Sequence, residues 1–191
     1  RKILAPDPEP HAQGYIVYDS KKSGTYTISH LRFGPRAIRA PYLLKSANFV
    51  GIHKFDFLYK RDPLAAPAAG TAVLINSPYG PDEAWNEIPR EAQQQIVDKK
   101  LEVHVIDASH VASALGLGSR VNTILQTCFF ALSGVMPREK AIEAIKRATE
   151  KTYAKKGKAI VEKNFAAIDN ALANLHEVRI PPNAAGQGIR L

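Results

Sequence analysis

The sequence contains a single cysteine, Cys128, among its 191 residues. One cysteine excludes a disulfide framework within this chain, and it also excludes a four-cysteine metal or iron–sulfur site. Scarce cysteine suits a reducing compartment, so we expect a cytoplasmic protein. The sequence also lacks any run of about 18 apolar residues, so we expect no membrane-spanning helix.

Several motifs of catalysis and metal binding are also missing. The six histidines form neither a His-Glu-x-x-His pattern nor a pairing with cysteine, which argues against a zinc site. No serine lies in a Gly-x-Ser-x-Gly motif, and Gly116-Leu117-Gly118 is too short for a dinucleotide fingerprint. Cys128 lies in a mainly apolar segment, which is typical of a small core residue and not of a nucleophile.

Charge is the clearest signal in the composition. The chain has 26 Lys and Arg against 18 Asp and Glu, which gives a net charge of +8. This balance favours anionic partners such as nucleic acid, phosphorylated cofactors or an acidic protein face. Residues 138–163 hold nine basic and four acidic side chains, and a solvated helix face accounts for such a segment. Few aromatic residues interleave with these charges, which argues against nucleic acid as the partner.

The order of helix and strand patterns predicts an α/β fold. The apolar run Gly70–Asn76 is typical of a buried strand, and Leu101–Asp107 predicts another. Apolar residues at helical spacing predict helices over Arg120–Val135, Arg138–Thr152 and Lys158–Glu177. The alternation of strands and helices predicts a three-layer sandwich with a mostly parallel sheet, helices on both faces and a helical C-terminal part.

We expect one α/β domain over residues 14–180. Residues 1–13 read as a linker or tail, because they are proline-rich and lack the apolar core of a signal peptide. Residues 181–191 contain two prolines and two glycines and read as an exit linker.

Polar residues follow two of the predicted strands. Asn76-Ser77-Pro78-Tyr79 ends the first of them, and Asp107-Ala108-Ser109-His110 ends the second. In open α/β sheets, ligands bind beyond the carboxyl ends of the strands, so these segments are candidate site positions. Helix capping is the alternative, and we favour it for Asp107 and Ser109.

A lysine-rich loop joins two strand patterns near the start of the chain. The strands are predicted over Tyr15–Tyr18 and Thr25–Phe33, and the loop is Asp19-Ser20-Lys21-Lys22-Ser23-Gly24. Two ammonium groups, two hydroxyls and a glycine suit the binding of an anion. A hairpin turn with solvated lysines is the alternative.

Several blocks of sequence resemble one known family. The blocks are Gln13–Gly24, Ser29–Pro35, Gln126–Val135, Lys151–Gly157, Asn164–Asp169 and Leu175–Val178. In this order they resemble the γ-type domain, the third domain, of pyruvate:ferredoxin/flavodoxin oxidoreductase. The resemblance extends from about Gln13 to Pro181.

The resemblance implies one domain of a larger enzyme. That enzyme uses thiamine diphosphate and iron–sulfur clusters, held in other domains, to convert pyruvate and coenzyme A to acetyl-CoA, carbon dioxide and reduced ferredoxin or flavodoxin. The resemblance therefore implies a usually homodimeric parent and an isolated chain that is inactive and binds neither nucleic acid nor membrane. It also implies coenzyme A contacts at Lys21, Lys22 and Ser23, with Arg32 as a weaker candidate.

The sequence departs from the family before Gln13. Family members have a strand and a loop of the type Gly-x-Gly-x-Asp-Gly-Thr-Val-Gly-Ala there, and Arg1–Pro10 contain no such loop. We expect the sheet to lack its first strand and coenzyme A to lack a phosphate cradle. Two other functions stay open: a structural module that joins domains through apolar residues such as Phe129 and Phe165, and a basic nucleic-acid-binding domain.

Overall fold

The computed structural model describes residues 11–18 and 27–181. The chain divides into two compact units between Lys45 and Ser46, and each unit is described by itself. The domain limits expected near residues 13 and 180 stay a prediction.

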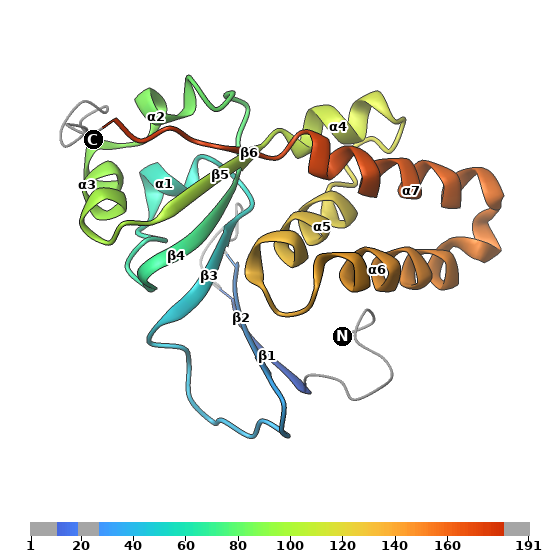
Figure 1. Cartoon of the computed structure of the whole chain (residues 1–191), viewed down its shortest axis with the longest axis horizontal. Coiled ribbons are helices and arrows are strands. Elements are labelled where there is room, and N and C mark those ends of the chain that lie inside the picture. Colours follow the sequence, from blue (N-terminus) through green and yellow to red (C-terminus); the bar gives the residue numbers. More distant parts are fainter. Residues whose placement is uncertain (1–10, 19–26, 182–191) are drawn as a thin grey trace. The chain divides into compact units, whose positions relative to one another are not determined.

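The first unit contains an antiparallel pair of strands (Figure 1). Strand β1 spans His11–Tyr18 and strand β2 spans Thr27–Gly34, with His11 opposite Gly34. Both expected strands are therefore confirmed, although β1 begins at His11, within the segment read as a tail. The side chain of Gln13 exchanges hydrogen bonds of 3.2 and 3.3 Å with the backbone of Ala40, so it ties β1 to the segment that follows β2.

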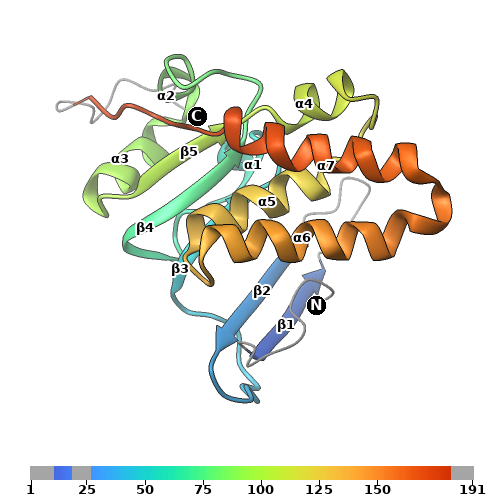
Figure 2. The same ribbon diagram turned by 45° about the vertical axis from the view of Figure 1, so that its right-hand side comes forward.

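The second unit is built on a four-stranded sheet with the order β3-β4-β5-β6. Strands β3 (Ala47–Ile52), β4 (Pro67–Asn76) and β5 (Glu102–Ile106) are parallel, and β6 (His176–Glu177) runs antiparallel to β5. Helices cover both faces of this sheet (Figure 2). The mostly parallel three-layer α/β sandwich is therefore confirmed.

Three short helices cover one face of the sheet. They are α1 (Phe57–Lys60), α2 (Ala84–Glu87) and α3 (Arg90–Asp98). Alternate residues of β4 and β5 point toward them, since successive side chains of a strand face opposite sides of a sheet. The largest side chains buried in this layer include Val73, Ile75, Val103, Val105, Trp85, Ile88 and Ile96.

The other face carries α4 (Ala108–Ala114) and α5 (Asn122–Ser133), and α5 packs on β4 and β3. Helix α6 (Arg138–Tyr153), the 3₁₀ turn η1 (Ala154–Lys156) and α7 (Lys158–Ala173) form a helical hairpin that packs on α5. The core of this layer includes Leu74, Ile106, Ile124, Leu125, Cys128, Ala167 and Ala171. Within the described residues, no helix has both the length and the apolar composition needed to cross a membrane.

The last helix ends earlier than its apolar spacing predicts. The predicted helix over Lys158–Glu177 is wrong at its end, because α7 stops at Ala173 and the chain then extends along β5 as β6. The N–H of Val178 donates to the carbonyl of Val103 at 2.8 Å, and the Val178 side chain is buried. Pairing covers the otherwise exposed edge of β5, and this gain outweighs continuation of the helix.

Candidate functional site

An open cleft of about 580 Å³ lies at the carboxyl ends of the three parallel strands. Its walls come from the segments that follow β3, β4 and β5 and from the first turns of α4. This is the edge at which open α/β sheets place their ligand sites. The polar side chains that line the cleft are His53, Lys54, Asp56, Asn76, Asp107, Ser109, His110 and Ser113.

Asn76 holds the three strand ends together. Its Nδ2 donates to the carbonyl of His53 at 3.2 Å, and its Oδ1 accepts from the N–H of Ala108 at 3.0 Å. Beside it, the N–H of Ser77 donates to the carbonyl of Ile106 at 3.0 Å. One side chain therefore connects the residue after β3 with the start of α4, and it fixes the rim of the cleft.

Asp107 caps helix α4. Its carboxylate accepts a hydrogen bond of 2.8 Å from the backbone N–H of His110. The capping role is therefore confirmed for Asp107. It is wrong for Ser109, which lies inside α4, where its side chain lines the cleft. The reason is positional, because only the residue just before the first helical turn can cap its free N–H groups.

The remaining polar groups of the cleft offer hydrogen bonds and little net charge. Desolvation by burial lowers the pKa of His53, which favours the neutral imidazole. Asp56 forms an exposed ion pair of 3.2 Å with Lys60. In residues 11–18 and 27–181, no three His, Cys, Asp or Glu side chains gather in a group that could hold a metal ion.

Sequence reasoning missed the contribution of His53 and Lys54. Both directly follow β3, which ends at Ile52, so the carboxyl-end rule that pointed to Asn76 and Asp107 also applied to them. The register that aligns β3 with β4, Ile52 opposite Ile75, brings them to the same edge.

Arg32 is the one candidate anion ligand that lies among the described residues. Its Nη2 donates to the carbonyl of Tyr42 at 2.5 Å, and its guanidinium carbon lies 4.9 Å from the centre of the Tyr42 ring. Arg32 therefore holds the segment after β2 against the strand pair. Lys21, Lys22 and Ser23 lie outside the described residues. The assignment of all four residues to a ligand stays a prediction.

The apolar residues considered as interdomain contacts pack within their own unit. The ring of Phe129 meets that of Phe49 edge-on, with 5.0 Å between the centroids. The ammonium of Lys146 lies 5.7 Å from the centre of the Phe165 ring. Cys128, next to Phe129, is fully buried, and burial raises the pKa of its thiol to about 12. The expected core role of Cys128 is confirmed.

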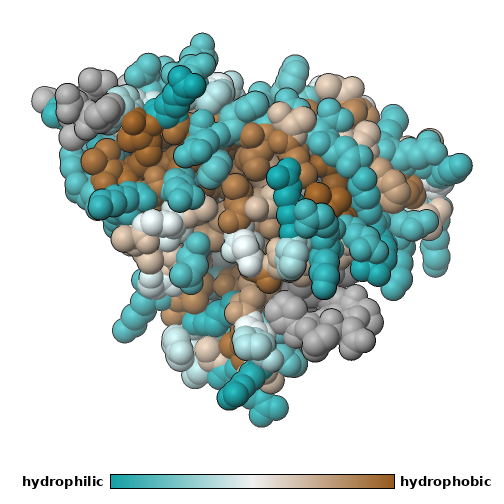
Figure 3. Space-filling model, in the orientation of Figure 1, coloured by the Kyte–Doolittle hydropathy of each residue, from teal (hydrophilic) through white to brown (hydrophobic). Residues whose placement is uncertain are grey.

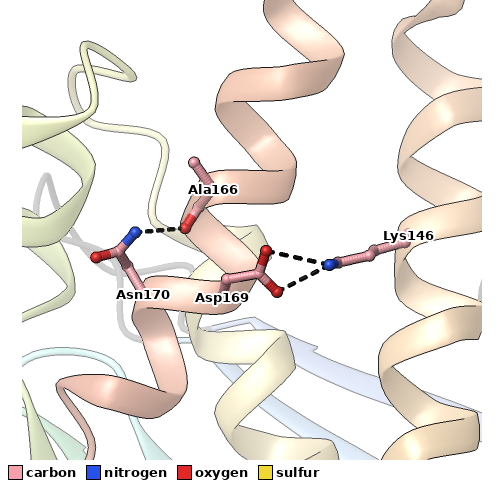
Figure 4. Close-up of polar contacts among 4 residues, drawn as sticks. All are labelled: Lys146, Ala166, Asp169 and Asn170. Carbon is pink, nitrogen blue, oxygen red and sulfur yellow. Dashed lines mark hydrogen bonds and ion pairs between the residues drawn. The ribbon is translucent and has the colours of Figure 1, made fainter.

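The basic segment 138–163 forms α6, η1 and the start of α7. Its basic side chains are exposed except that of Lys146, which is half-buried. Lys146 contacts Asp169 of α7 at 2.8 Å (Figure 4). Two further ion pairs are longer: Arg147 to Glu143 at 3.9 Å, and Lys158 to Glu162 at 3.8 Å. The expected solvated helix face is confirmed.

Comparison with known sequences gives one consistent result. The family profile described as "Pyruvate ferredoxin/flavodoxin oxidoreductase" matches residues 8–174. The pyruvate-flavodoxin oxidoreductase of Rhodospirillum rubrum is 54% identical over 188 residues, which are 98% of this chain and 16% of the relative. The pyruvate:ferredoxin oxidoreductase of Moorella thermoacetica is 42% identical, with 96% of this chain and 16% of the relative covered. The chain thus spans a small part of the length of these relatives.

Two solved structures share the fold. Pyruvate oxidoreductase subunit PORC from Thermotoga maritima has a TM-score of 0.64 at 14% identity, with 89% of this chain and 83% of that chain covered. The 2-oxoglutarate:ferredoxin oxidoreductase from Magnetococcus marinus, with 2-oxoglutarate, coenzyme A and succinyl-CoA bound, has a TM-score of 0.57 at 15% identity. In that case 85% of this chain and 26% of the other are covered.

Proposed function

The chain belongs to the pyruvate ferredoxin/flavodoxin oxidoreductase family, and we propose that it is the γ-type domain of such an enzyme and contributes to coenzyme A binding. The observation that carries the proposal is the match over residues 8–174, together with 54% identity to a pyruvate-flavodoxin oxidoreductase across 98% of the chain. The parent enzyme would convert pyruvate and coenzyme A to acetyl-CoA and carbon dioxide. The two electrons released would pass to ferredoxin or flavodoxin.

The chemistry of the loop after β1 supports the coenzyme A assignment. Coenzyme A carries a diphosphate and a 3′-phosphate, and Lys21, Lys22 and Ser23 supply ammonium and hydroxyl donors that suit them. The loop joins the paired ends Tyr18 and Thr27. Arg32 uses one guanidinium nitrogen on Tyr42, and a guanidinium has five N–H donors, so it retains capacity for a phosphate.

The other groups of the reaction belong elsewhere in the parent. An iron–sulfur cluster needs several thiolate ligands, and this chain has only Cys128, whose thiol is buried in the core of the second unit. The residues present therefore do not fit a cluster. We assign the clusters and thiamine diphosphate to other domains and expect the isolated chain to be inactive.

Contacts with other domains of the parent are the second part of the proposal. A two-stranded pair is marginal by itself, and β1 and β2 leave Ile16 and Leu31 exposed by 49% and 52%. The strand register puts these two side chains on the same face, since Gly14 lies opposite Leu31. Such a face favours a neighbouring domain as its cover.

We further propose that the parent enzyme is a homodimer and that it resides in the cytoplasm. In that compartment the buried thiol of Cys128 would stay reduced.

The test is coenzyme A binding by the intact parent enzyme when the loop lysines are removed. Replacement of Lys21 and Lys22 by alanine should weaken coenzyme A binding and leave the KM for pyruvate unchanged. Unaltered coenzyme A binding would favour the purely structural role of the domain.

A further inference from the structure

The turn between α6 and α7 carries a concentrated positive charge. Four lysines with exposed side chains gather at it: Lys151 near the end of α6, Lys155 and Lys156 in η1, and Lys158 at the start of α7. No Asp or Glu occurs between Glu150 and Glu162. The turn lies at the end of the helical hairpin that points away from the sheet (Figure 1), and hydrophilic side chains project from this end (Figure 3). We call residues 151–158 the lysine turn.

Most of this charge is not neutralised by the described part of the chain. Lys151 and Lys155 have no ion pair or hydrogen bond from their ammonium groups to a described residue, and Lys158 reaches Glu162 only at 3.8 Å. Lys156 lies 5.7 Å from the centre of the Tyr153 ring. Lys146, deeper in the hairpin, differs because both carboxylate oxygens of Asp169 contact its ammonium. Among the described residues, the charge of the lysine turn is therefore largely left without an acidic partner.

The backbone that presents these lysines is well supported. Helix α6 buries Ala141, Ile145 and Thr149 against its neighbours, so its orientation is fixed by packing. The turn closes through Gly157, whose φ of 103° suits a glycine, and whose N–H donates to the carbonyl of Ala154 at 3.3 Å. Four ammonium groups are thus held at one end of a packed hairpin.

The composition of the lysine turn argues against several kinds of anionic partner. It exposes no large apolar side chain and contains no arginine, whereas permanent interfaces are rich in aromatics and arginine and poor in lysine. Tyr153, the only aromatic residue of the turn, is half-buried and lies beneath Lys156, which leaves no free ring for stacking of a nucleic-acid base. The turn contributes no residue to the cleft at the strand ends, where a small phosphorylated ligand would find a concave site.

An exposed group of lysines without large apolar side chains or arginine is typical of a weak encounter between proteins that is guided by charge. Electron-transfer complexes have small interfaces, and charge complementarity acts chiefly on their rate of association. We propose that the lysine turn is a transient docking surface for an acidic face of the protein that accepts electrons from the parent enzyme. The proposal rests on the proposed function, because flavodoxin is the electron acceptor expected for a relative of the Rhodospirillum rubrum pyruvate-flavodoxin oxidoreductase.

The experiment compares two double variants of the intact parent enzyme that change its charge equally. Lys151→Glu/Lys155→Glu alters the lysine turn, and Lys45→Glu/Lys100→Glu alters two exposed lysines elsewhere. Reduction of flavodoxin and of a small viologen dye is measured with pyruvate and coenzyme A. The turn variant should raise the KM for flavodoxin about tenfold at low ionic strength, and the difference should fade near 0.5 M salt. The dye-linked rate of the turn variant should change less than about twofold. The KM of the control variant for flavodoxin should likewise change less than about twofold.

Three results would overturn the docking role. An unchanged flavodoxin KM would do so directly. An equal loss of dye-linked and flavodoxin-linked rates would mean that the turn contacts another domain of the enzyme. Lower retention of RNA or DNA by the turn variant, with no effect on the KM for flavodoxin, would identify a nucleic-acid surface.

A different result would count against the proposed function and not against the docking role of the turn. That result is a wild-type enzyme that reduces the dye without need of coenzyme A. The variant Lys151→Arg/Lys155→Arg, which keeps the charge, should behave as the wild type.

Discussion

Lys146 of α6 contacts both carboxylate oxygens of Asp169 in α7, at 2.8 Å to Oδ1 and 3.1 Å to Oδ2 (Figure 4). The two helices are the arms of the hairpin that ends in the lysine turn. The side chain of Asp169 is 61% exposed and that of Lys146 is 32% exposed. Water therefore screens the pair, and its contribution to stability should be modest.

A double-mutant cycle with Lys146→Ala and Asp169→Ala should give a coupling of about 0.2–1 kcal/mol. The measurement is urea unfolding of the 191-residue chain, and the coupling should fall as salt is added. The pair Arg147 and Glu143 provides a control, because its separation is 3.9 Å and both side chains are about two-thirds exposed. Its coupling should be smaller. Equal couplings for the two pairs would contradict this interpretation.

Asn76→Ala should cost about 1–3 kcal/mol of unfolding free energy, because it leaves the N–H of Ala108 and the carbonyl of His53 without their partner. Chemical denaturation of wild type and variant provides the measurement. Asn48→Ala is the matched control, since Asn48 is exposed on β3. Similar losses for the two variants would mean that Asn76 does not hold the strand ends together.

The thiol of Cys128 should resist alkylation in the folded chain. Burial raises its pKa to about 12 from an ordinary value of 9.0, so at pH 8 the thiolate fraction is about a thousandfold lower than in an exposed cysteine. Folding should also lose stability as the pH rises from 9 toward 12, because the unfolded thiol ionises first. Labelling with iodoacetamide before and after addition of urea checks the first point. Rapid labelling of the folded chain would contradict the core role.

Acid should destabilise the fold partly through His104. Desolvation lowers its pKa below the ordinary 6.5, although Glu177 and Glu102 oppose the shift. A histidine with a lowered folded pKa stabilises the fold above the unfolded value, and this stability is lost as the pH falls below 6.5. Unfolding of wild type and His104→Gln between pH 7.5 and 5 tests this. The variant should show the shallower loss; parallel curves would exclude a role for His104.

The central strands were predictable from sequence because a strand buried on both faces has a continuous run of apolar residues. The apolar runs Gly70–Asn76 and Leu101–Asp107 became β4 and β5, since a strand covered by helices on both sides needs continuous apolar residues. The same reasoning pointed to Asn76 and Asp107 as residues at strand ends, and both line the cleft.

Other features were not predictable, because they depend on contacts between distant residues. Strand β6 is two residues long, too short for any periodic pattern, and it forms only because His104 and Val105 lie opposite Glu177 and His176. The apolar spacing of Leu172 and Leu175 even favoured continuation of the helix. The dual role of Asn76 likewise depends on the alignment of three strand ends, which no local pattern records.

Binding of coenzyme A to the intact parent enzyme tests the central claim most directly. Isothermal titration would compare wild type with Lys21→Ala/Lys22→Ala and with the control Lys100→Ala/Lys140→Ala, which removes the same charge from exposed positions in the second unit. If the loop binds phosphate, the Kd should rise about tenfold or more in the loop variant, since each charge-assisted contact is worth about 1.5–3 kcal/mol. The control should bind as the wild type does. An unchanged Kd in the loop variant would contradict a role for this domain's lysines in coenzyme A binding.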